Sequence, residues 1–349
     1  RDEAHRAREH RGGSVRSVVD GMIASGLRWA VVGTGDISRR VIADLREVSM
    51  GSITAVWGRS EERAGLFAAE FGIPSWTNEL AELLGRGDVD VVYIATPSET
   101  HCEIAVQALR AGKHVLIEKP IAMSAAEARE IFDVAAGQGL FAMEAMWMKF
   151  NPLHKEIERR VAAGLLGEVS SVRASFGTPF HARGGRTSPA QAGSALRDRG
   201  IYTVTLAHWL LGEGGVGYAE GTLLDGVDVR GSAVLRFGAT PHAQLAWSGT
   251  EFLDLSAAVS GDRGWVEFEA MFWAGTRARI HAGSAERIFV TPEVVDFPRV
   301  GNGYQSMLRE VESMISDGAI MHPRHAPDAT MQVTRTLDSI EQAVRAQAE

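Results

Sequence analysis

Residues 27–38 read Leu27-Arg28-Trp29-Ala30-Val31-Val32-Gly33-Thr34-Gly35-Asp36-Ile37-Ser38, an apolar run that leads through two glycines into a helical pattern. The run predicts a buried strand, and Gly33 permits the tight turn behind it. Gly35 lets a pyrophosphate approach the backbone, and the following helix offers unpaired N–H groups to an anion. Although Ser38 replaces the usual third glycine, the strand–loop–helix context predicts a dinucleotide site made by Gly33, Thr34, Gly35, Asp36 and Ile37.

Strands and helices alternate through the rest of the first half. Further strands are predicted at Ser52–Trp57, Val89–Ala95, Val115–Ile117 and Leu140–Met143, with helices at 61–71, 80–84, 99–111 and 124–139. This alternation is typical of an α/β doubly wound parallel sheet, so residues 27–149 are expected to form a Rossmann domain. Residues 1–26 lack the apolar core of a signal peptide and are expected to be a disordered or loosely attached extension.

The pattern changes after Phe150. Apolar and polar residues alternate in the later strands, which is typical of an antiparallel sheet with one solvated face. Residues 150–349 are therefore expected to form an α+β domain for substrate binding and oligomerisation, built on a large open sheet, with the closing helices packing back on the first domain. Because an open face must be covered or solvated, we expect a homodimer or homotetramer through this sheet.

Composition excludes several classes of protein. The 349 residues carry a formal net charge of −8, which does not favour a nucleic-acid partner. No apolar run approaches the ~20 residues of a membrane span. The single cysteine, Cys102, cannot form an internal disulfide, so a cytoplasmic location is expected. The histidines show no spacing with cysteines or acids that predicts a metal site.

The end of the second predicted strand favours NADP over NAD. NAD sites place an acid there for the ribose 2′-hydroxyl, whereas this chain has Trp57-Gly58-Arg59-Ser60. The guanidinium of Arg59 and the hydroxyl of Ser60 could hold a 2′-phosphate.

Two further strand ends are expected to border the cofactor. Thr96 and Pro97 follow one strand, and Glu118-Lys119-Pro120 follows the next. In doubly wound sheets, ligands bind outside the carboxyl ends of the strands. A lysine beside a nicotinamide ring can hold a substrate hydroxyl and favour its ionised form, which hydride removal requires. Glu118 is expected on the cofactor side.

Four segments together resemble the glucose-fructose oxidoreductase/inositol dehydrogenase (Gfo/Idh/MocA) family, and within it the dimeric dihydrodiol dehydrogenase and D-xylose dehydrogenase branch. They are Gly33-Thr34-Gly35, Glu118-Lys119-Pro120, residues 144–152 and residues 193–202. The resemblance implies a Rossmann domain followed by a domain with a large open sheet. It also implies that Lys119 is the essential lysine and that Tyr202 transfers the proton.

Asp198 and Tyr202 are four residues apart, so on a helix they share one face. We expect Tyr202 to take the proton of a substrate hydroxyl, helped by the nearby Lys119 cation, while Asp198 orients the substrate or the lysine. The resemblance further implies that Trp147 and Lys149 line the site, and Phe176 and His181 are expected to border it. Arg197 and Arg199 flank the acid with unusual charge.

The leading hypothesis is an NADP-dependent oxidoreductase acting on a sugar, a cyclic polyol or a trans-dihydrodiol, with oxidation of an aldose to a lactone as the first case. One alternative retains the fold but uses tightly bound cofactor for epimerisation or glycoside cleavage. Another is a non-catalytic regulator that senses NADP. The presence of both Lys119 and Tyr202 disfavours the regulator, because a sensor needs neither side chain.

Overall fold

The computed structural model describes residues 26–180 and 193–347. Its first half is a parallel sheet of order β3-β2-β1-β4-β5-β6, which confirms the predicted doubly wound arrangement. The strands are β1 (Arg28–Val32), β2 (Ser52–Trp57), β3 (Trp76–Thr77), β4 (Val91–Ile94), β5 (His114–Ile117) and β6 (Ala142–Glu144). The helices are α1 (Asp36–Val48), α2 (Glu61–Phe71), α3 (Leu80–Leu84), α4 (His101–Arg110) and α5 (Ala125–Gln138).

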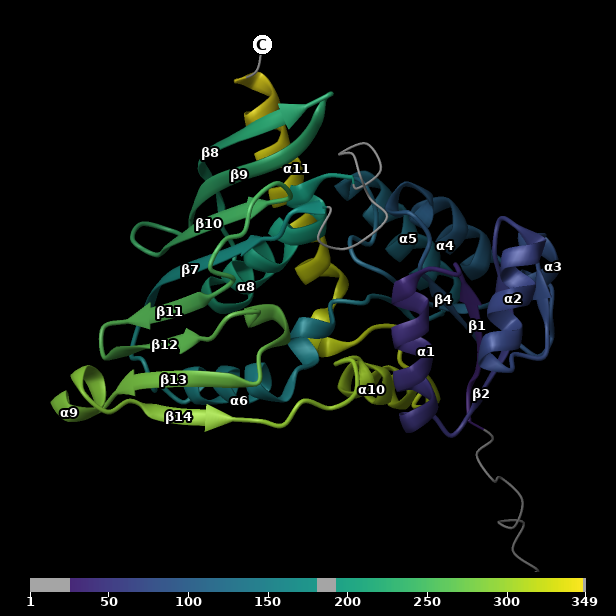
Figure 1. The fold of residues 1–349 in the computed structure, drawn as a ribbon, viewed down its shortest axis with the longest axis horizontal. Coiled ribbons are helices and arrows are strands. Elements are labelled where there is room, and N and C mark those ends of the chain that lie inside the picture. The colour runs from purple at the N-terminus through teal and green to yellow at the C-terminus, as the bar shows by residue number, and fades with distance from the viewer. Residues whose placement is uncertain (1–25, 181–192, 348–349) are drawn as a thin grey trace, which may run out of the picture.

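The second half contains a sheet of order β14-β13-β12-β11-β7-β10-β9-β8. Its strands are β7 (Val169–Gly177), β8 (Gly215–Leu224), β9 (Val227–Arg236), β10 (His242–Ser248), β11 (Ala257–Gly261), β12 (Gly264–Phe268), β13 (Arg277–Ala282) and β14 (Glu293–Asp296). Neighbouring strands are antiparallel except for β7 and β10, which run parallel. The expected large, mainly antiparallel sheet is thus confirmed, and it lies on the left of Figure 1, opposite the Rossmann sheet.

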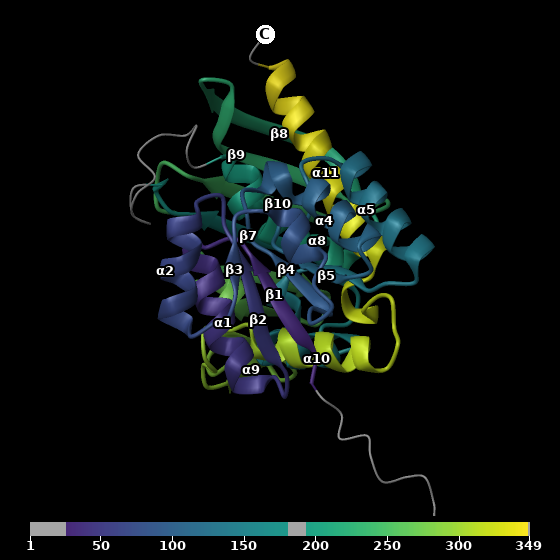
Figure 2. The ribbon, with the colours of Figure 1, turned by 90° about the vertical axis from the view of Figure 1, so that its right-hand side faces the viewer.

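The second half also contains helices, and some of them lie between the two sheets. They are α6 (Pro152–Ala162), α8 (Ile201–Leu211), α9 (Ala285–Phe289), α10 (Gln305–Ser316) and α11 (Pro327–Ala346). α10 packs against α1, and α11 packs against α5, α8 and β8. Figure 2 shows α11 running beside α5 and past β8. Helix α11 therefore bridges the two halves, with contacts to α5 of the Rossmann half and, at its end, to β8 of the large sheet.

The two faces of the Rossmann sheet belong to different cores. Ala30 and Val32 of β1 face a cluster formed with α3, α4 and α5. Trp29 and Val31 face the other side, where one apolar cluster continues through α10 and α8 to the large sheet. This follows from the alternation of side chains along a strand. The shared core fixes how the two halves meet.

Candidate active site

The glycine loop has the local geometry of a nucleotide cradle. Gly33 has φ +117°, and a Cβ there would lie 2.5 Å from the carbonyl oxygen of Ala95, so only glycine suits the position. A Cβ on Gly35 would meet no atom within 4 Å. Gly35 is the N-cap of α1 and no side chain caps that helix, so its first N–H groups can receive an anion. Ser38 is fully buried and supplies the close helix–strand packing of the missing third glycine.

The end of β2 lies as expected for the adenosine half of a dinucleotide. Arg59 is exposed directly after the strand. Ser60 is the N-cap of α2, where its hydroxyl accepts a hydrogen bond from the backbone N–H of Arg63 at 3.3 Å. A phosphate at this point would meet the positive end of the α2 dipole as well as the Arg59 guanidinium.

Lys119 and Asp198 meet where the two halves join. The Lys119 ammonium donates to Asp198 Oδ1 at 2.8 Å and to the Asp198 backbone carbonyl at 2.9 Å. Lys119 follows β5, whereas Asp198 belongs to a π-helical turn, η4 (Leu196–Gly200), that leads into α8. The structure therefore unites two residues that are 79 positions apart.

Tyr202 stands beside this ion pair, in the first turn of α8. Its ring centroid lies 5.2 Å from Lys119 Nζ, which is a cation–π distance. The hydroxyl accepts a hydrogen bond from Trp147 Nε1 at 2.9 Å. A donor to this oxygen favours the ionised form of the phenol, because the charge that develops on deprotonation is shared with the N–H group.

Aromatic rings pack around the ring of Tyr202. Phe176, at the end of β7, stacks on Trp273 with centroids 3.5 Å apart, and both rings lie about 6 Å from that of Tyr202. Tyr304 packs against Trp147 at 5.1 Å. The sequence predicts Trp147 and Phe176 at the site, but not Trp273 or Tyr304. Trp273 lies in a short 3-10 turn (Phe272–Ala274) and Tyr304 is the N-cap of α10, so neither stands in a motif that indicates what it faces.

Buried polar groups hold the loop that carries Lys119 and the neighbouring loop after β4. The ring nitrogens of His101 lie 2.9 Å from the carbonyl oxygens of Thr96 and Pro120, so this histidine joins the loops after β4 and β5. The Tyr93 hydroxyl donates to Glu118 at 2.7 Å. Burial raises the pKa of Glu118. The Glu118 carboxylate thus has a hydrogen-bond partner inside the fold.

Lys149 is not brought to this cluster. Its ammonium lies 5.4 Å from the ring centroid of Trp209, at the far end of α8 from Tyr202. The two aromatic residues are seven positions apart on the helix, which is about 10 Å along its axis. Burial lowers the pKa of Lys149 to about 8. Lys149 thus lies at the opposite end of α8 from Tyr202, and His181, also expected to border the site, lies outside the described residues.

Residues 26–180 and 193–347 contain no group of three or more His, Cys, Asp or Glu side chains that could hold a metal ion. This part of the chain also contains no helix long and apolar enough to cross a membrane.

A parallel nucleotide-binding sheet, an open second sheet and a Lys–Asp–Tyr cluster at their junction define a two-domain nicotinamide-dependent oxidoreductase. Comparison with known proteins gives the family. Residues 27–146 match the model of the oxidoreductase family with an NAD-binding Rossmann fold (Gfo/Idh/MocA), and residues 154–267 match the Gfo/Idh/MocA C-terminal domain. The chain belongs to the Gfo/Idh/MocA family, which confirms the resemblance seen in the sequence.

Characterised relatives are redox enzymes. The trans-1,2-dihydrobenzene-1,2-diol dehydrogenase of Xenopus laevis is 30% identical over 281 residues, which cover 79% of this chain and 84% of the relative. A 3-ketoreductase from Actinomadura kijaniata, solved with TDP-benzene and NADP, is 27% identical with a TM-score of 0.78 and covers 91% of this chain and 98% of its own. The aldose-aldose oxidoreductase of Caulobacter crescentus, solved with glycerol, is 25% identical with a TM-score of 0.81, covering 92% and 98%.

Proposed function

We propose that this protein is a cytoplasmic NADP-dependent dehydrogenase that transfers hydride between nicotinamide and a hydroxyl-bearing carbon of a cyclic substrate. The substrate class is a sugar, a cyclic polyol or a trans-dihydrodiol, with aldose oxidation to a lactone as the first case to test. The observation that carries the proposal is the Lys119–Asp198 ion pair beside the hydrogen-bonded Tyr202 hydroxyl. NADP⁺, when bound, supplies the hydride acceptor at nicotinamide C4.

The residues divide the remaining chemistry between them. In the oxidative direction the Tyr202 oxygen takes the proton of the substrate hydroxyl as the C–H bond gives up its hydride. Lys119 holds that hydroxyl and stabilises negative charge on both oxygens, and Asp198 fixes the lysine through its carboxylate and its backbone carbonyl. The Trp147 N–H group keeps the phenol oriented toward the substrate.

The aromatic walls favour a ring-shaped substrate. Trp273 is only partly buried and is held by stacking on the buried Phe176, so its indole can pack against the C–H surface of a pyranose or against an unsaturated ring. A pyranose and a trans-dihydrodiol share neighbouring hydroxyls on a six-membered ring. This common shape supports one site for either compound class.

A purified-protein screen tests the proposal. NADP⁺ reduction followed at 340 nm over aldoses, inositols and trans-dihydrodiols is expected to give turnover with a cyclic diol or hemiacetal. The Tyr202→Phe variant should lose turnover by about 10²-fold or more, while NADPH fluorescence titration gives an unchanged Kd. Tight NADP binding without turnover of any compound would support the sensor alternative instead. Full turnover by Tyr202→Phe would remove this residue from the mechanism.

We also propose a homodimer through the open face of the large sheet. The register places exposed or half-exposed residues in one row across it, namely Gln244, Arg173, Ala258, Glu267 and Arg279. Small and oppositely charged side chains in one row suit a self-complementary contact between two copies.

A further inference from the structure

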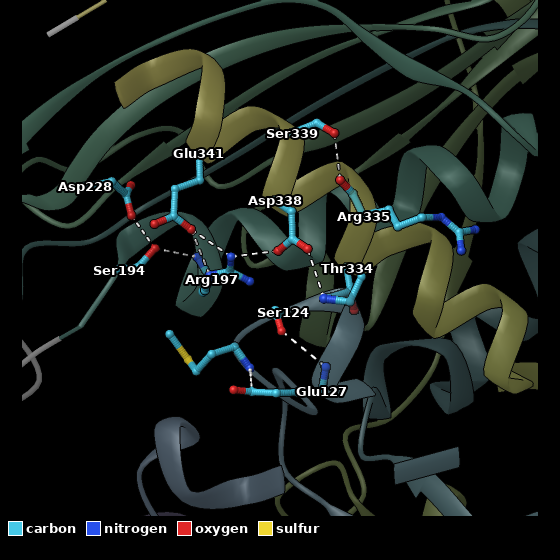
Figure 3. Close-up of polar contacts among 12 residues, drawn as sticks. Ser124, Glu127, Ser194, Arg197, Asp228, Thr334, Arg335, Asp338, Ser339 and Glu341 are labelled. Atoms are coloured by element: carbon cyan, nitrogen blue, oxygen red, sulfur yellow. Dashed lines mark hydrogen bonds and ion pairs between the residues drawn. The ribbon is translucent and has the colours of Figure 1, made fainter. Parts of the chain in front are cut away.

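Arg197 is buried although it carries a permanent charge. Its Nη2 donates to Asp338 Oδ1 at 2.9 Å and to Glu341 Oε2 at 2.7 Å, and both acceptors belong to α11. Burial lowers the pKa of Arg197, but the bonds to the two carboxylates outweigh burial, so the pKa lies above its usual value. Because a buried cation is costly without partners, these bonds fix the guanidinium against α11, as Figure 3 shows.

The second carboxylate oxygen of Asp338 bonds to the Rossmann domain. Its Oδ2 accepts a hydrogen bond from the backbone N–H of Ala125 at 2.9 Å. Ala125 is the first residue of α5 and lies six positions after Lys119. The Asp338 carboxylate thus joins Arg197, which precedes Asp198, to the start of α5, which follows Lys119.

The backbone of η4 is also held from the large sheet. The Ser194 hydroxyl accepts from the Arg197 N–H group at 3.1 Å and is itself bonded to Asp228 of β9. Asp228 further accepts from the Leu196 N–H group at 3.1 Å and from Trp247 Nε1 at 2.8 Å. The turn that carries Asp198 is therefore anchored on both sides.

The position of this turn matters for Lys119. The lysine bonds both to the side chain and to the backbone carbonyl of Asp198, so a shift of η4 moves both acceptors together. A misplacement of about 1 Å can cost 10²-fold in rate.

We propose that Arg197 is a positioning residue, which sets the Lys119–Asp198 pair through a second interdomain link. This link, the Arg197 tie, consists of the bonds from Arg197 to Asp338 and Glu341 and from Ala125 to Asp338. The inference rests on the proposed function, because it takes Lys119 and Asp198 as parts of a dehydrogenase site. The experiments therefore include one readout that needs no turnover.

The kinetic test uses Asp338→Asn, which preserves shape but removes the charge that binds Arg197. It should lower kcat by about tenfold or more while the NADP Kd and the substrate KM change less than about twofold. Arg197→Lys should retain more kcat than Arg197→Leu, because it keeps a cation beside α11. In the Arg197→Leu background, adding Asp338→Asn should lower kcat little further, since both substitutions break the same link.

Arg345→Gln is the matched control. Arg345 lies on α11 and also donates to Glu341, but its side chain is half exposed and makes no bond to Asp338 or to η4. This variant should retain the wild-type kcat. Unchanged kcat in Asp338→Asn would overturn the proposal, and so would a loss of kcat that only parallels a fall in Tm and in cofactor binding.

Hydrogen exchange gives the readout without substrate. In Asp338→Asn, amides of residues 196–202 and of 120–128 should both exchange several-fold faster, whereas Arg345→Gln should match the wild type. If the wild type turns over no compound but this paired response is present, the proposed function fails and the Arg197 tie stands. If only one of the two segments responds, the tie is overturned.

Discussion

Trp147 matters at the scale of single residues because its N–H group is bonded to the Tyr202 hydroxyl. The family resemblance places Trp147 in the site, but the sequence does not reveal which atom it contacts. The hydrogen bond arises because the short turn η2 (Trp147–Phe150) directs the indole toward α8. The role of this tryptophan is therefore electrostatic as well as steric.

The Trp147→Phe variant separates these two roles. Phenylalanine preserves the ring that packs on Tyr304 but removes the donor, so kcat should fall by about tenfold. For substrate oxidation, the rising, acidic limb of the kcat profile should move to higher pH, because the ionised tyrosine that acts as the base loses a stabilising partner. The measurement is kcat from pH 6 to 10. Trp209→Phe, which loses a bond to Glu158 instead, should behave as the wild type, and identical profiles for both variants would refute the role.

Arg59 is the proposed determinant of the preference for NADP over NAD. Arg59→Ala should reduce the ratio of kcat/KM for NADP⁺ over NAD⁺ by about tenfold or more, because a charge-assisted bond to the 2′-phosphate is lost. Arg110→Ala, which alters an exposed arginine in the last turn of α4, should leave the ratio unchanged. An unaltered ratio in Arg59→Ala would contradict the assignment.

At the scale of secondary-structure elements, helix α6 contains a buried histidine that makes stability depend on pH. His154 is buried between the rings of Trp209 and Phe268. Both of its ring nitrogens lack a hydrogen-bond partner among the residues that the structure describes. Burial lowers the pKa of His154 to about 3. The folded state therefore admits only the neutral imidazole.

This burial makes stability depend on pH in one direction. The unfolded chain binds the proton below about pH 6.5, whereas the folded chain resists it down to about 3. Stability from this residue is thus complete above pH 6.5 and falls as pH drops toward 3, by about 2 kcal/mol at pH 5. When the pH is lowered from 8 to 5, the Tm of His154→Phe in thermal unfolding should fall less than the Tm of the wild type. Parallel losses in the two proteins would show that His154 is not the cause.

Much of the secondary structure could be predicted from local pattern. The strands β1, β4 and β5 are nearly continuous apolar runs, and β10 and β12 alternate as half-buried strands do. β8 could not be predicted, because its glycines and largely exposed residues give no alternation, and pairing with β9 is what makes it a strand. The site residues likewise differ in whether local sequence indicates them. Lys119 and Tyr202 stand in motifs, whereas Trp273 reaches the site only through the tertiary fold.

At the scale of the whole molecule, the open sheet face is the proposed contact between two copies. Ala258→Arg would place a long cation in the middle of that face. Light scattering after size exclusion should then show a fall from twice the chain mass to 37.6 kDa. Glu103→Arg, on an exposed position of α4, should remain dimeric. A wild type that is monomeric, or a variant that is still dimeric, would contradict the proposed interface.

The packing of α10 and α11 on the first domain has a consequence for protein engineering. Because these helices contact α1 and α5, the Rossmann unit comprises two separate stretches of chain. A chimera joined near residue 150 would replace the last helices together with the large sheet and leave apolar surface on α1 and α5 facing foreign side chains. Exchanging substrate domains between relatives therefore calls for two crossover points, with the native C-terminal helices restored after the last strand.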